Sequence, residues 1–167
     1  PLGPNTVTFE ATDVNGLSST CSFTVTVLEE VDPEITCPAD IIIDNDPGLC
    51  SAVVSYTAPV GTDDCGGEST ALTAGLGSGA VFPVGVTTEE YTVTDLSGNT
   101  ATCSFTITVN DTELPVLECP EDLVVSTDEG VCEATVSFDP PLVTDNCDET
   151  LIPVQTAGPV SGSTFPL

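Results

Sequence analysis

The stretch Cys103-Ser104-Phe105-Thr106-Ile107-Thr108-Val109 alternates strictly between apolar and hydroxyl-bearing side chains. A period of two places every apolar residue on one face, which is typical of a half-buried β-strand. The same pattern occurs at residues 21–27 (CSFTVTV), and related alternations begin at Cys50 and at Cys132. No segment has the period of an amphipathic helix. The sequence therefore predicts an all-β fold.

The sequence also repeats itself at a nearly constant offset, which decides its organisation. The segment 33–38 (PEITCP) returns as 115–120 (PVLECP), 82 positions later. The same offset relates Cys21 to Cys103, Cys50 to Cys132, and Cys65 to Cys147. After Cys147 the offset becomes 83, because Phe82-Pro83 returns as Phe165-Pro166. We therefore expect the C-terminal part of one repeat at 1–31, a complete repeat at 32–110, and the N-terminal part of a third at 111–167.

Residues 44–48 and 96–99 supply turns, and loops with Pro, Gly and Asp separate six or seven short strands in a repeat of roughly 80 residues. This spacing fits an immunoglobulin-like β-sandwich better than a barrel or a propeller. We predict tandem immunoglobulin-like β-sandwiches, one complete and two partial. A core of this size is small, so we expect disulfides to add stability.

The charge of the chain limits its partners. It contains 27 acidic residues and no Lys, Arg or His, which gives a formal net charge of −27. Nucleic acid and acidic membrane surfaces require a basic patch, so neither is expected to bind directly. Catalysis is also disfavoured, because Ser or Cys nucleophiles lack a His or Lys base, and paired carboxylates lack aromatic platforms and cations. Cations are the natural small partners, and we predict that the chain is not an enzyme.

The eight cysteines predict disulfides in an oxidising compartment, and hence an extracellular or cell-surface location. A zinc site is disfavoured because no CxxC pair occurs. The four cysteines of the complete repeat allow three connectivities, among which we favour Cys37 with Cys65 because both should lie near one end of the sandwich. The predicted disulfide residues are Cys21, Cys37, Cys50, Cys65, Cys103, Cys119, Cys132 and Cys147.

A set of short motifs resembles the hyalin repeat (HYR) family over essentially the whole chain. The motifs are Cys37-Pro38, Asp63-Asp64-Cys65, Phe82-Pro83-Val84-Gly85, Thr94-Asp95-Leu96-Ser97-Gly98-Asn99 and Cys103-Ser104-Phe105-Thr106-Ile107. Two positions depart from the family pattern: Asp64 replaces the usual Asn, which Asn146 keeps, and Leu17 stands where the first hairpin should have Asn. The resemblance implies an immunoglobulin-like fold and a role in extracellular adhesion or matrix assembly. It implies no particular ligand.

Carboxylates gathered at one end of each sandwich indicate candidate Ca²⁺ sites, because Ca²⁺ takes six to eight oxygen ligands from Asp, Glu, Asn and backbone carbonyls. In an immunoglobulin-like unit the entry linker, the loop after the second strand and the last hairpin share one end. The alternative is that these residues only form turns and solvate the surface. The candidates at the first junction are Glu29, Glu30, Asp32, Asp63, Asp64, Asp95 and Asn99, and those at the second are Asn110, Asp111, Glu113, Asp145 and Asn146.

Two classes of function follow. The first is a structural or adhesive fibre, stalk or surface appendage, stiffened by Ca²⁺ at the junctions; the second is a carbohydrate- or surface-binding module. We favour the first, because sugar-binding modules expose aromatic rings, whereas Tyr56 and Tyr91 both lie on apolar strand faces. A glycan array probed in Ca²⁺ distinguishes the two classes. The sequon at Asn110 is a candidate N-glycosylation site.

The two partial repeats should each need a missing half, because neither can close a core alone. Phe165-Pro166-Leu167 followed by Gly3 would reproduce the motif 82–85. We therefore expect residues 111–167 of one copy and 3–31 of the next to form one sandwich, with neighbouring copies of the array as partners. A covalent array, of which this chain is an internal piece, is preferred over separate subunits joined by strand complementation.

Overall fold

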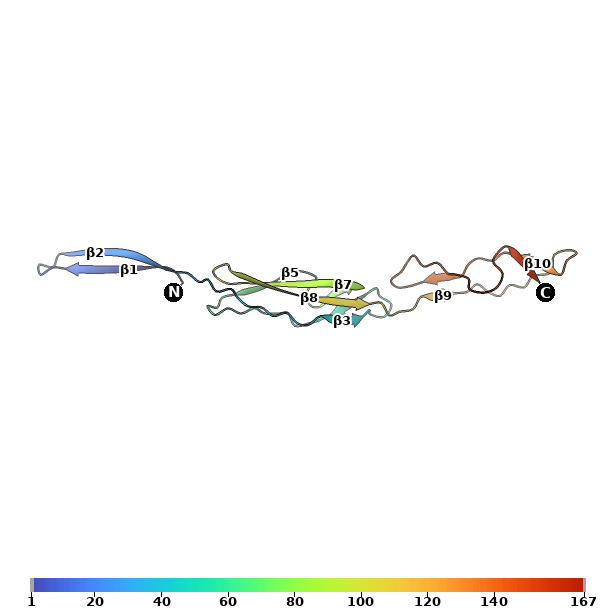
Figure 1. Cartoon of the computed structure of the whole chain (residues 1–167), viewed down its shortest axis with the longest axis horizontal. Coiled ribbons are helices and arrows are strands. Elements are labelled where there is room, and N and C mark those ends of the chain that lie inside the picture. Colours follow the sequence, from blue (N-terminus) through green and yellow to red (C-terminus); the bar gives the residue numbers. More distant parts are fainter. Residues whose placement is uncertain (1, 167) are drawn as a thin grey trace. The chain divides into compact units, whose positions relative to one another are not determined.

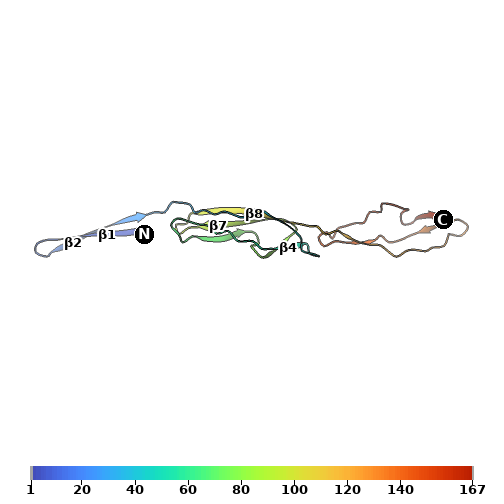
Figure 2. The same ribbon diagram turned by 90° about the horizontal axis from the view of Figure 1, so that it is seen from below.

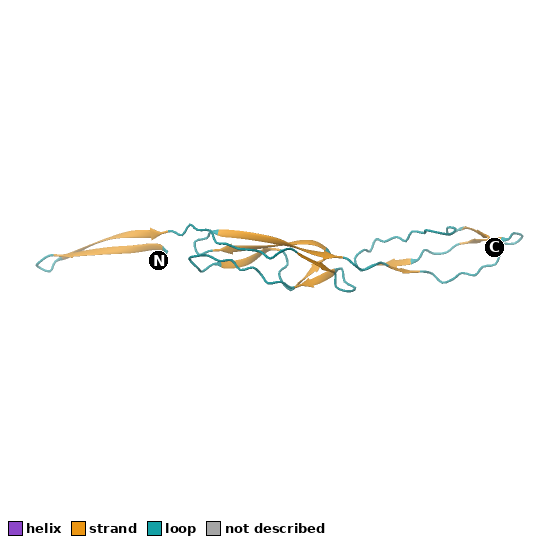
Figure 3. Cartoon of the chain, turned by 60° about the horizontal axis from the view of Figure 1, so that its bottom comes forward, coloured by secondary structure: helices purple, strands orange, loops and turns teal. Residues whose placement is uncertain are grey.

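The computed structural model describes residues 2–166, which form β-strands, turns and loops, with no helix among them. Figure 3 shows strands in orange and loops in teal. Because the described residues include no helix, none of them forms a helix long and apolar enough to cross a membrane. The strands are β1 (Gly3–Thr12), β2 (Ser18–Val27), β3 (Ile41–Asp44), β4 (Ser51–Val54), β5 (Ser69–Ala74), β6 (Ala80–Pro83), β7 (Gly85–Thr94), β8 (Thr100–Asn110), β9 (Val116–Glu118), β10 (Glu133–Val136), β11 (Leu142–Thr144) and β12 (Ser163–Pro166). The all-β prediction is confirmed.

The complete repeat contains two sheets. One has four strands in the order β3-β8-β7-β5, and the other pairs β4 with β6. The long strands β7 and β8 run side by side (Figures 1 and 2). The alternating stretch 103–109 lies on β8, where Phe105, Ile107 and Val109 are buried and the Thr side chains between them are partly exposed. Alternating burial along β8 follows from the two-residue period of a strand.

The buried apolar residues lie mainly in the complete repeat and come from both of its sheets. Phe82, Val93 and Ile107 are fully buried. Burial of such side chains is the main favourable contribution to folding, at roughly 1.5–3 kcal/mol each. Among residues 2–166, the buried apolar set is Ala52, Val54, Phe82, Tyr91, Val93, Phe105, Ile107, Val109, Ala134 and Val136.

The hairpin of β1 and β2 corresponds to strands β7 and β8 of the complete repeat, but its apolar face is not buried. Its antiparallel register runs from Gly3 opposite Val27 to Thr12 opposite Ser18. Phe9 and Phe23 stack with ring centroids 6.2 Å apart. Nevertheless they are 60% and 53% exposed, whereas the residues at the same repeat positions on β7 and β8, Tyr91 and Phe105, are 5% and 4% exposed.

The third part of the chain forms only those strands whose pairing strand is also present. β10 pairs with β12 and β11 with β9, as the corresponding segments do in the complete repeat. In contrast, residues 123–126 and 152–157 form no strand, although they correspond to β3 and β5. The reason is that β3 and β5 flank β8 and β7 in their sheet. Their counterparts here have no such strands to pair with, so the ladder does not form.

The chain divides into two compact units whose boundaries cut through the complete repeat. The first unit contains the chain up to Ile41 with Val54–Ala80 and Thr87–Ile107. The second contains Ile42–Val53, Val81–Val86 and the chain from Thr108 onward. Each unit therefore contains one junction between two repeats.

Candidate functional site: the junctions between repeats

At the first junction three carboxylates approach one another. Glu29 lies in the linker after β2, Asp63 in the loop between β4 and β5, and Asp95 directly after β7. One oxygen from each of the three lies within 4.8 Å of the other two. Segments from both sides of the junction therefore meet in one acidic cluster, which we call the junction cluster.

The hairpin that joins β7 to β8 is built around Asp95, which is only 7% exposed. Asp95 Oδ1 accepts hydrogen bonds from the backbone N–H groups of Ser97, Gly98 and Asn99 at 2.9, 2.6 and 2.8 Å. Gly98 has φ of +95°, which an L-residue adopts only with strain. The Thr-Asp-x-x-Gly-Asn motif therefore specifies both the turn and the position of the Asp95 carboxylate.

Asn99 ties this hairpin to the linker that precedes the repeat. Its Nδ2 donates to Asp95 Oδ2 at 2.8 Å, to Glu29 Oε2 at 3.1 Å and to the carbonyl of Val31 at 3.3 Å. Asn99 was predicted as an oxygen ligand, but here its amide nitrogen bridges two carboxylates. The first hairpin has Leu17 at this position, so Asp13 still caps its turn but no amide bridges onward.

Asp63 holds an oxygen that has no hydrogen-bond partner. Its Oδ2 accepts the backbone N–H of Cys65 at 2.8 Å, which forms a turn. Its Oδ1 is buried and receives no hydrogen bond from the described residues. A buried acceptor without a partner costs about 1–3 kcal/mol, and more when it is charged. The junction cluster is therefore short of a positive or hydrogen-donating group.

The carboxyl groups in the cluster perturb one another. The hydrogen-bonding contact with Asp95 raises the pKa of Glu29, and burial and the Asp63 charge add to this, while the backbone N–H of Val31 opposes it. Burial acts to raise the pKa of Asp95, but hydrogen bonds from Asn99, Glu29 and Gly98 outweigh burial and lower it. In acid, Glu29 therefore takes up a proton before Asp95 does.

The other residues predicted at this junction lie around the cluster. Asp64 comes close to Glu29 and Cys65 in a second, more exposed group. Asp32 lines an open cavity of about 420 Å³ together with Asp63 and Asp64. Glu30 is exposed and belongs to none of the acidic groups among the described residues.

The second junction shares part of the arrangement of the first, without a counterpart of Asp95 among the described residues. Asp111 and Asp145 lie close together with Cys147, at the repeat positions of Glu29, Asp63 and Cys65. Asp145 Oδ1 accepts the backbone N–H groups of Cys147 and Asp148 at 2.8 and 3.0 Å. Asp111 Oδ1 accepts the backbone N–H of Glu113 at 3.2 Å. The sulfur of Cys147 is in a disulfide, so only the oxygens are candidate ligands.

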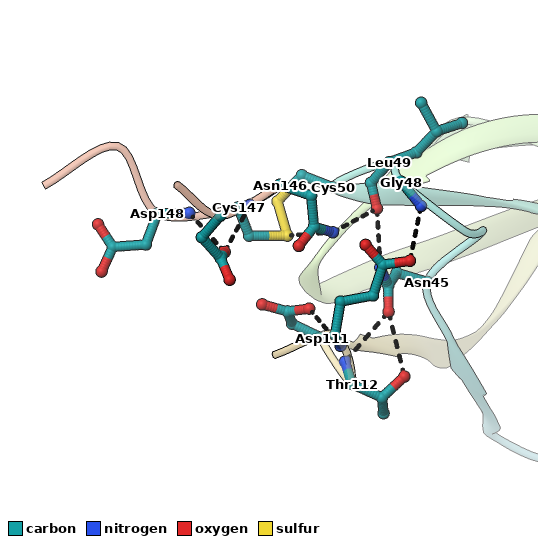
Figure 4. The surroundings of a disulfide bond; sticks show 11 residues. Asn45, Gly48, Leu49, Cys50, Asp111, Thr112, Asn146, Cys147 and Asp148 are labelled. Carbon is teal, nitrogen blue, oxygen red and sulfur yellow. Dashed lines mark hydrogen bonds between the residues drawn. A yellow bond between two sulfur atoms is a disulfide. The ribbon is translucent and has the colours of Figure 1, made fainter. Parts of the chain in front are cut away.

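Hydrogen bonds hold the turn after β3 against this junction (Figure 4). Asn45 Oδ1 accepts the backbone N–H of Thr112 at 3.1 Å, and Glu113 Oε1 accepts that of Gly48 at 2.6 Å. Asn146 Nδ2 donates to the carbonyl of Leu49 at 3.0 Å, while its Oδ1 is buried without a partner. Residues 44–48 are predicted from sequence only as a turn, because no residue pattern indicates a contact across a junction.

Asn110, predicted at this junction and as a glycosylation site, is the exposed last residue of β8. Its carbonyl accepts the backbone N–H of Asn45 at 2.8 Å. Glycosylation of Asn110 stays a prediction.

The disulfides differ from the expected pairing. Cys37 bonds Cys103, with Cα atoms 5.6 Å apart, so the favoured bond from Cys37 to Cys65 is wrong. Cys37 lies shortly before β3, and β3 is next to β8, which carries Cys103. The second bond joins Cys50 to Cys147, with Cα atoms 4.8 Å apart. It links the complete repeat to the next one, so it lies outside the three connectivities within a repeat.

The remaining cysteines, Cys21, Cys65, Cys119 and Cys132, are exposed thiols. Burial, followed by the charges of Asp64 and Glu29, raises the pKa of the Cys65 thiol. Each of the four lies at the repeat position of a cysteine that is in a disulfide elsewhere in the chain.

The chain is therefore a tandem array of β-rich repeats, two of which are joined by a disulfide, with acidic groups at the junctions. The HYR domain family matches residues 30–109 and 110–167, and the chain belongs to this family. It is 35% identical over 173 aligned residues to hyalin of Strongylocentrotus purpuratus, covering 100% of this chain and 14% of that protein. It is 34% identical over 149 residues to hyalin of Lytechinus variegatus, covering 86% of this chain and 28% of that protein.

A third relative is named for domains of other kinds. It is the sushi, von Willebrand factor type A, EGF and pentraxin domain-containing protein 1 of Rattus norvegicus, 34% identical over 136 residues. The match covers 80% of this chain and 4% of that protein. The chain therefore spans a small fraction of the length of the relatives that it matches.

Proposed function

We propose that the chain is a structural or adhesive segment of an extracellular fibre, stalk or surface appendage built from tandem immunoglobulin-like sandwiches. The observation that carries the proposal is the disulfide from Cys50 to Cys147, since a covalent bond between successive repeats serves cohesion along an array. A net charge of −27 keeps long arrays from collapsing or clumping. The hyalin relatives and the disulfides support an extracellular setting.

A carbohydrate-binding role is less well supported. The hydroxyls of Tyr56 and Tyr91 bond each other at 2.9 Å, and Tyr91 is buried, so neither ring forms a platform for a sugar. Phe9 and Phe23 are exposed, but they lie at core positions of the repeat.

The partner in this proposal is a neighbouring repeat of the same kind. The hairpin of β1 and β2 exposes Phe23, whose counterpart Phe105 contacts Tyr56 edge-on at 5.0 Å between ring centroids. The third part of the chain offers Phe138 at the position of Tyr56, together with two segments that lack a pairing strand. A hairpin from a neighbouring copy, placed between residues 123–126 and 152–157, would restore the four-stranded order β3-β8-β7-β5 and cover both apolar faces.

The association of the chain with itself tests this part of the proposal. We expect sedimentation velocity to show association that increases with concentration. We expect Phe23→Asp to weaken it about 100-fold, equivalent to about 2.7 kcal/mol, because a carboxylate would enter the new core. The matched control is Val14→Asp, which adds the same charge at the fully exposed tip of the same hairpin. A chain that stays monomeric, or that loses association equally with both substitutions, would contradict the proposed array.

The second part of the proposal is that Ca²⁺ binds the junction cluster. Glu29, Asp63 and Asp95 supply close oxygens from three segments, and buried Asp63 Oδ1 lacks a partner. A divalent cation would satisfy that oxygen and offset the repulsion among the carboxylates. Because Glu29 belongs to the linker and Asp95 to the hairpin, the same ion would stiffen the junction.

Replacing one carboxylate should distinguish specific binding of Ca²⁺ at the cluster from general screening of the negative charge by Ca²⁺. We expect Asp63→Asn to weaken Ca²⁺ binding about 10-fold by calorimetry, or about 1.4 kcal/mol. Adding a chelator should broaden the range of maximum dimensions of the chain measured by small-angle X-ray scattering, while the complete repeat stays folded. Asp122→Asn is the control, because it removes the same charge from an exposed position outside the acidic groups. Equal affinities for the two variants, or scattering unchanged by Ca²⁺ and chelator, would show that no ion binds this cluster.

A further inference from the structure

The eight cysteines divide into four repeat positions, and the structure shows one complete bond of each kind. Cys37 and Cys103 form the bond within a repeat, and Cys50 and Cys147 form the bond between repeats. The unpaired cysteines occupy the same four positions once each: Cys119 corresponds to Cys37, Cys21 to Cys103, Cys132 to Cys50, and Cys65 to Cys147.

The turn around unpaired Cys132 already has the geometry of the turn around Cys50. Asp46 N–H donates to the carbonyl of Ser51 at 2.8 Å, and Asp46 Oδ2 accepts the N–H of Val53 at 3.0 Å. At the corresponding positions, Asp128 N–H donates to the carbonyl of Glu133 at 2.8 Å, and Asp128 Oδ2 accepts the N–H of Thr135 at 3.0 Å. One half of the bond between repeats is therefore preformed where no partner is present.

The other half is preformed as well. Unpaired Cys65 has its N–H bound to Asp63 Oδ2 at 2.8 Å, and disulfide-bonded Cys147 has its N–H bound to Asp145 Oδ1 at the same distance. Cys65 and Cys132 are both exposed. Local hydrogen bonds thus hold both thiols as their bonded counterparts are held.

We propose that a disulfide of the Cys50–Cys147 kind joins repeats at every junction, so that Cys132 bonds the following repeat and Cys65 bonds the preceding one. This proposal rests on the proposed function, an array of repeats, and adds which cysteines bond to one another along that array. In a head-to-tail pair of copies, Cys132 of one copy bonds Cys65 of the next, and Cys119 bonds Cys21. In a continuous array, where a copy has a neighbour on each side, all eight of its cysteines are then paired.

A disulfide at each junction would limit the motion of one repeat relative to the next. The backbone linker from β8 to β9 is one covalent connection between successive repeats, and the disulfide is a second. Two connections restrict bending and prevent one repeat from swinging away from the next. Tension is also shared between the linker and the turn that carries Cys50.

The chemistry requires an oxidant. Two thiols lose two protons and two electrons as the sulfur–sulfur bond forms, and a small disulfide such as oxidised glutathione accepts them and is released as two thiols. Extracellular and other oxidising compartments supply such disulfides.

The test follows the bonds in the full chain. A Cys21→Ser/Cys119→Ser variant, oxidised in glutathione buffer, leaves only Cys65 and Cys132 to join copies. We expect covalent oligomers on a non-reducing gel, and mass spectrometry after Glu-C digestion should identify Cys65–Cys132 between copies and Cys50–Cys147 within one. Adding Cys132→Ser should abolish the oligomers, whereas adding Val14→Asp should leave them unchanged.

Several outcomes would overturn the proposal: bonds joining Cys65 to Cys65, bonds joining Cys132 to Cys132, or a bond from Cys50 to Cys65 within a repeat. A variant that associates in sedimentation but forms no covalent oligomers would overturn the disulfide pattern and leave the proposed array intact. A chain that does not associate at all would contradict both the proposed array and the disulfide pattern. Reducing the natural fibre identifies the source of the neighbouring repeat: single chains are released if it is a second copy, and longer polypeptides remain if it belongs to the same chain.

Discussion

Replacing both Cys37 and Cys103 by Ser should lower the free energy of unfolding of the complete repeat by about 4 kcal/mol, as the loss of a loop of this length predicts. The bond closes 66 residues, most of the repeat, and links the segment before β3 to β8. For a domain of roughly 80 residues this corresponds to a fall in melting temperature of about 15–30 °C. Scanning calorimetry of the oxidised chain measures it.

A matched pair of substitutions controls for the loss of two sulfur atoms. Cys21→Ser/Cys119→Ser removes two exposed thiols that are unpaired within the chain, so it should leave the transition of the complete repeat unchanged in dilute, monomeric protein. Cys65→Ser should likewise have no effect on that transition. A large fall with Cys65→Ser and none with Cys103→Ser would contradict the observed pairing and restore the one favoured from sequence.

The strands were predictable because alternation is a local property. The period of two at 103–109 and 21–27 places the same apolar face on β8 and β2. Pairing is not local, however: the repeat pattern indicates that half of the third repeat is missing, but not that residues 123–126 and 152–157 are the segments left without a pairing strand. That outcome follows from sheet order, which puts their missing partners between them.

The disulfides show a related limit of sequence reasoning. Cys37 and Cys65 were assigned to one end of the sandwich from the loops that carry them, whereas strand order brings Cys37 to Cys103. The bond from Cys50 to Cys147 lay outside the three connectivities considered, because those assumed that each repeat is closed. A 97-residue separation between two loops leaves no trace in local patterns.

Glu89 is the clearest residue that sequence reasoning passed over. It lies on β7 with the same parity as Tyr91 and Val93, so alternation alone places it on the buried face. It is 0% exposed. Its carboxyl group accepts hydrogen bonds from the N–H groups of Leu76 and Gly77 at 2.7 and 2.9 Å and from the Tyr56 hydroxyl at 2.7 Å.

The surroundings of Glu89 are arranged for this carboxyl group. Gly75, with φ of +102°, has no side chain, and a Cβ there would collide with the carboxyl group. Burial, with Tyr91 and Glu89 adding to it, raises the pKa of Tyr56, which keeps that hydroxyl a hydrogen-bond donor. The network thus fixes the loop 75–77 against β7.

The other repeats in the chain lack every side-chain member of this network. Val7 stands at the position of Glu89, Phe138 at that of Tyr56, and Phe9 at that of Tyr91. Pro159, which has no N–H, stands at the position of Leu76. The polar groups are therefore present together or absent together, as expected when removing one partner costs more than replacing all of them.

This pattern predicts a non-additive result in the complete repeat. Glu89→Val alone should destabilise it by about 3 kcal/mol, because the Tyr56 hydroxyl and two N–H groups lose their acceptor. Adding Tyr56→Phe and Tyr91→Phe should recover about 1–2 kcal/mol of that loss, because no tyrosine hydroxyl is then left unpaired, whereas the two N–H groups still lack their acceptor. Denaturant unfolding of the four proteins in the cycle measures the coupling.

Glu90→Val serves as the control, since Glu90 is the next residue of β7 on the opposite face and its carboxylate bonds an exposed Thr73 hydroxyl at 3.0 Å. It should change stability by no more than about 0.5 kcal/mol. If the Phe substitutions added to the loss caused by Glu89→Val instead of offsetting it, the tyrosines would be stabilising the core independently of Glu89. The correlated absence in the other repeats would then need a different cause.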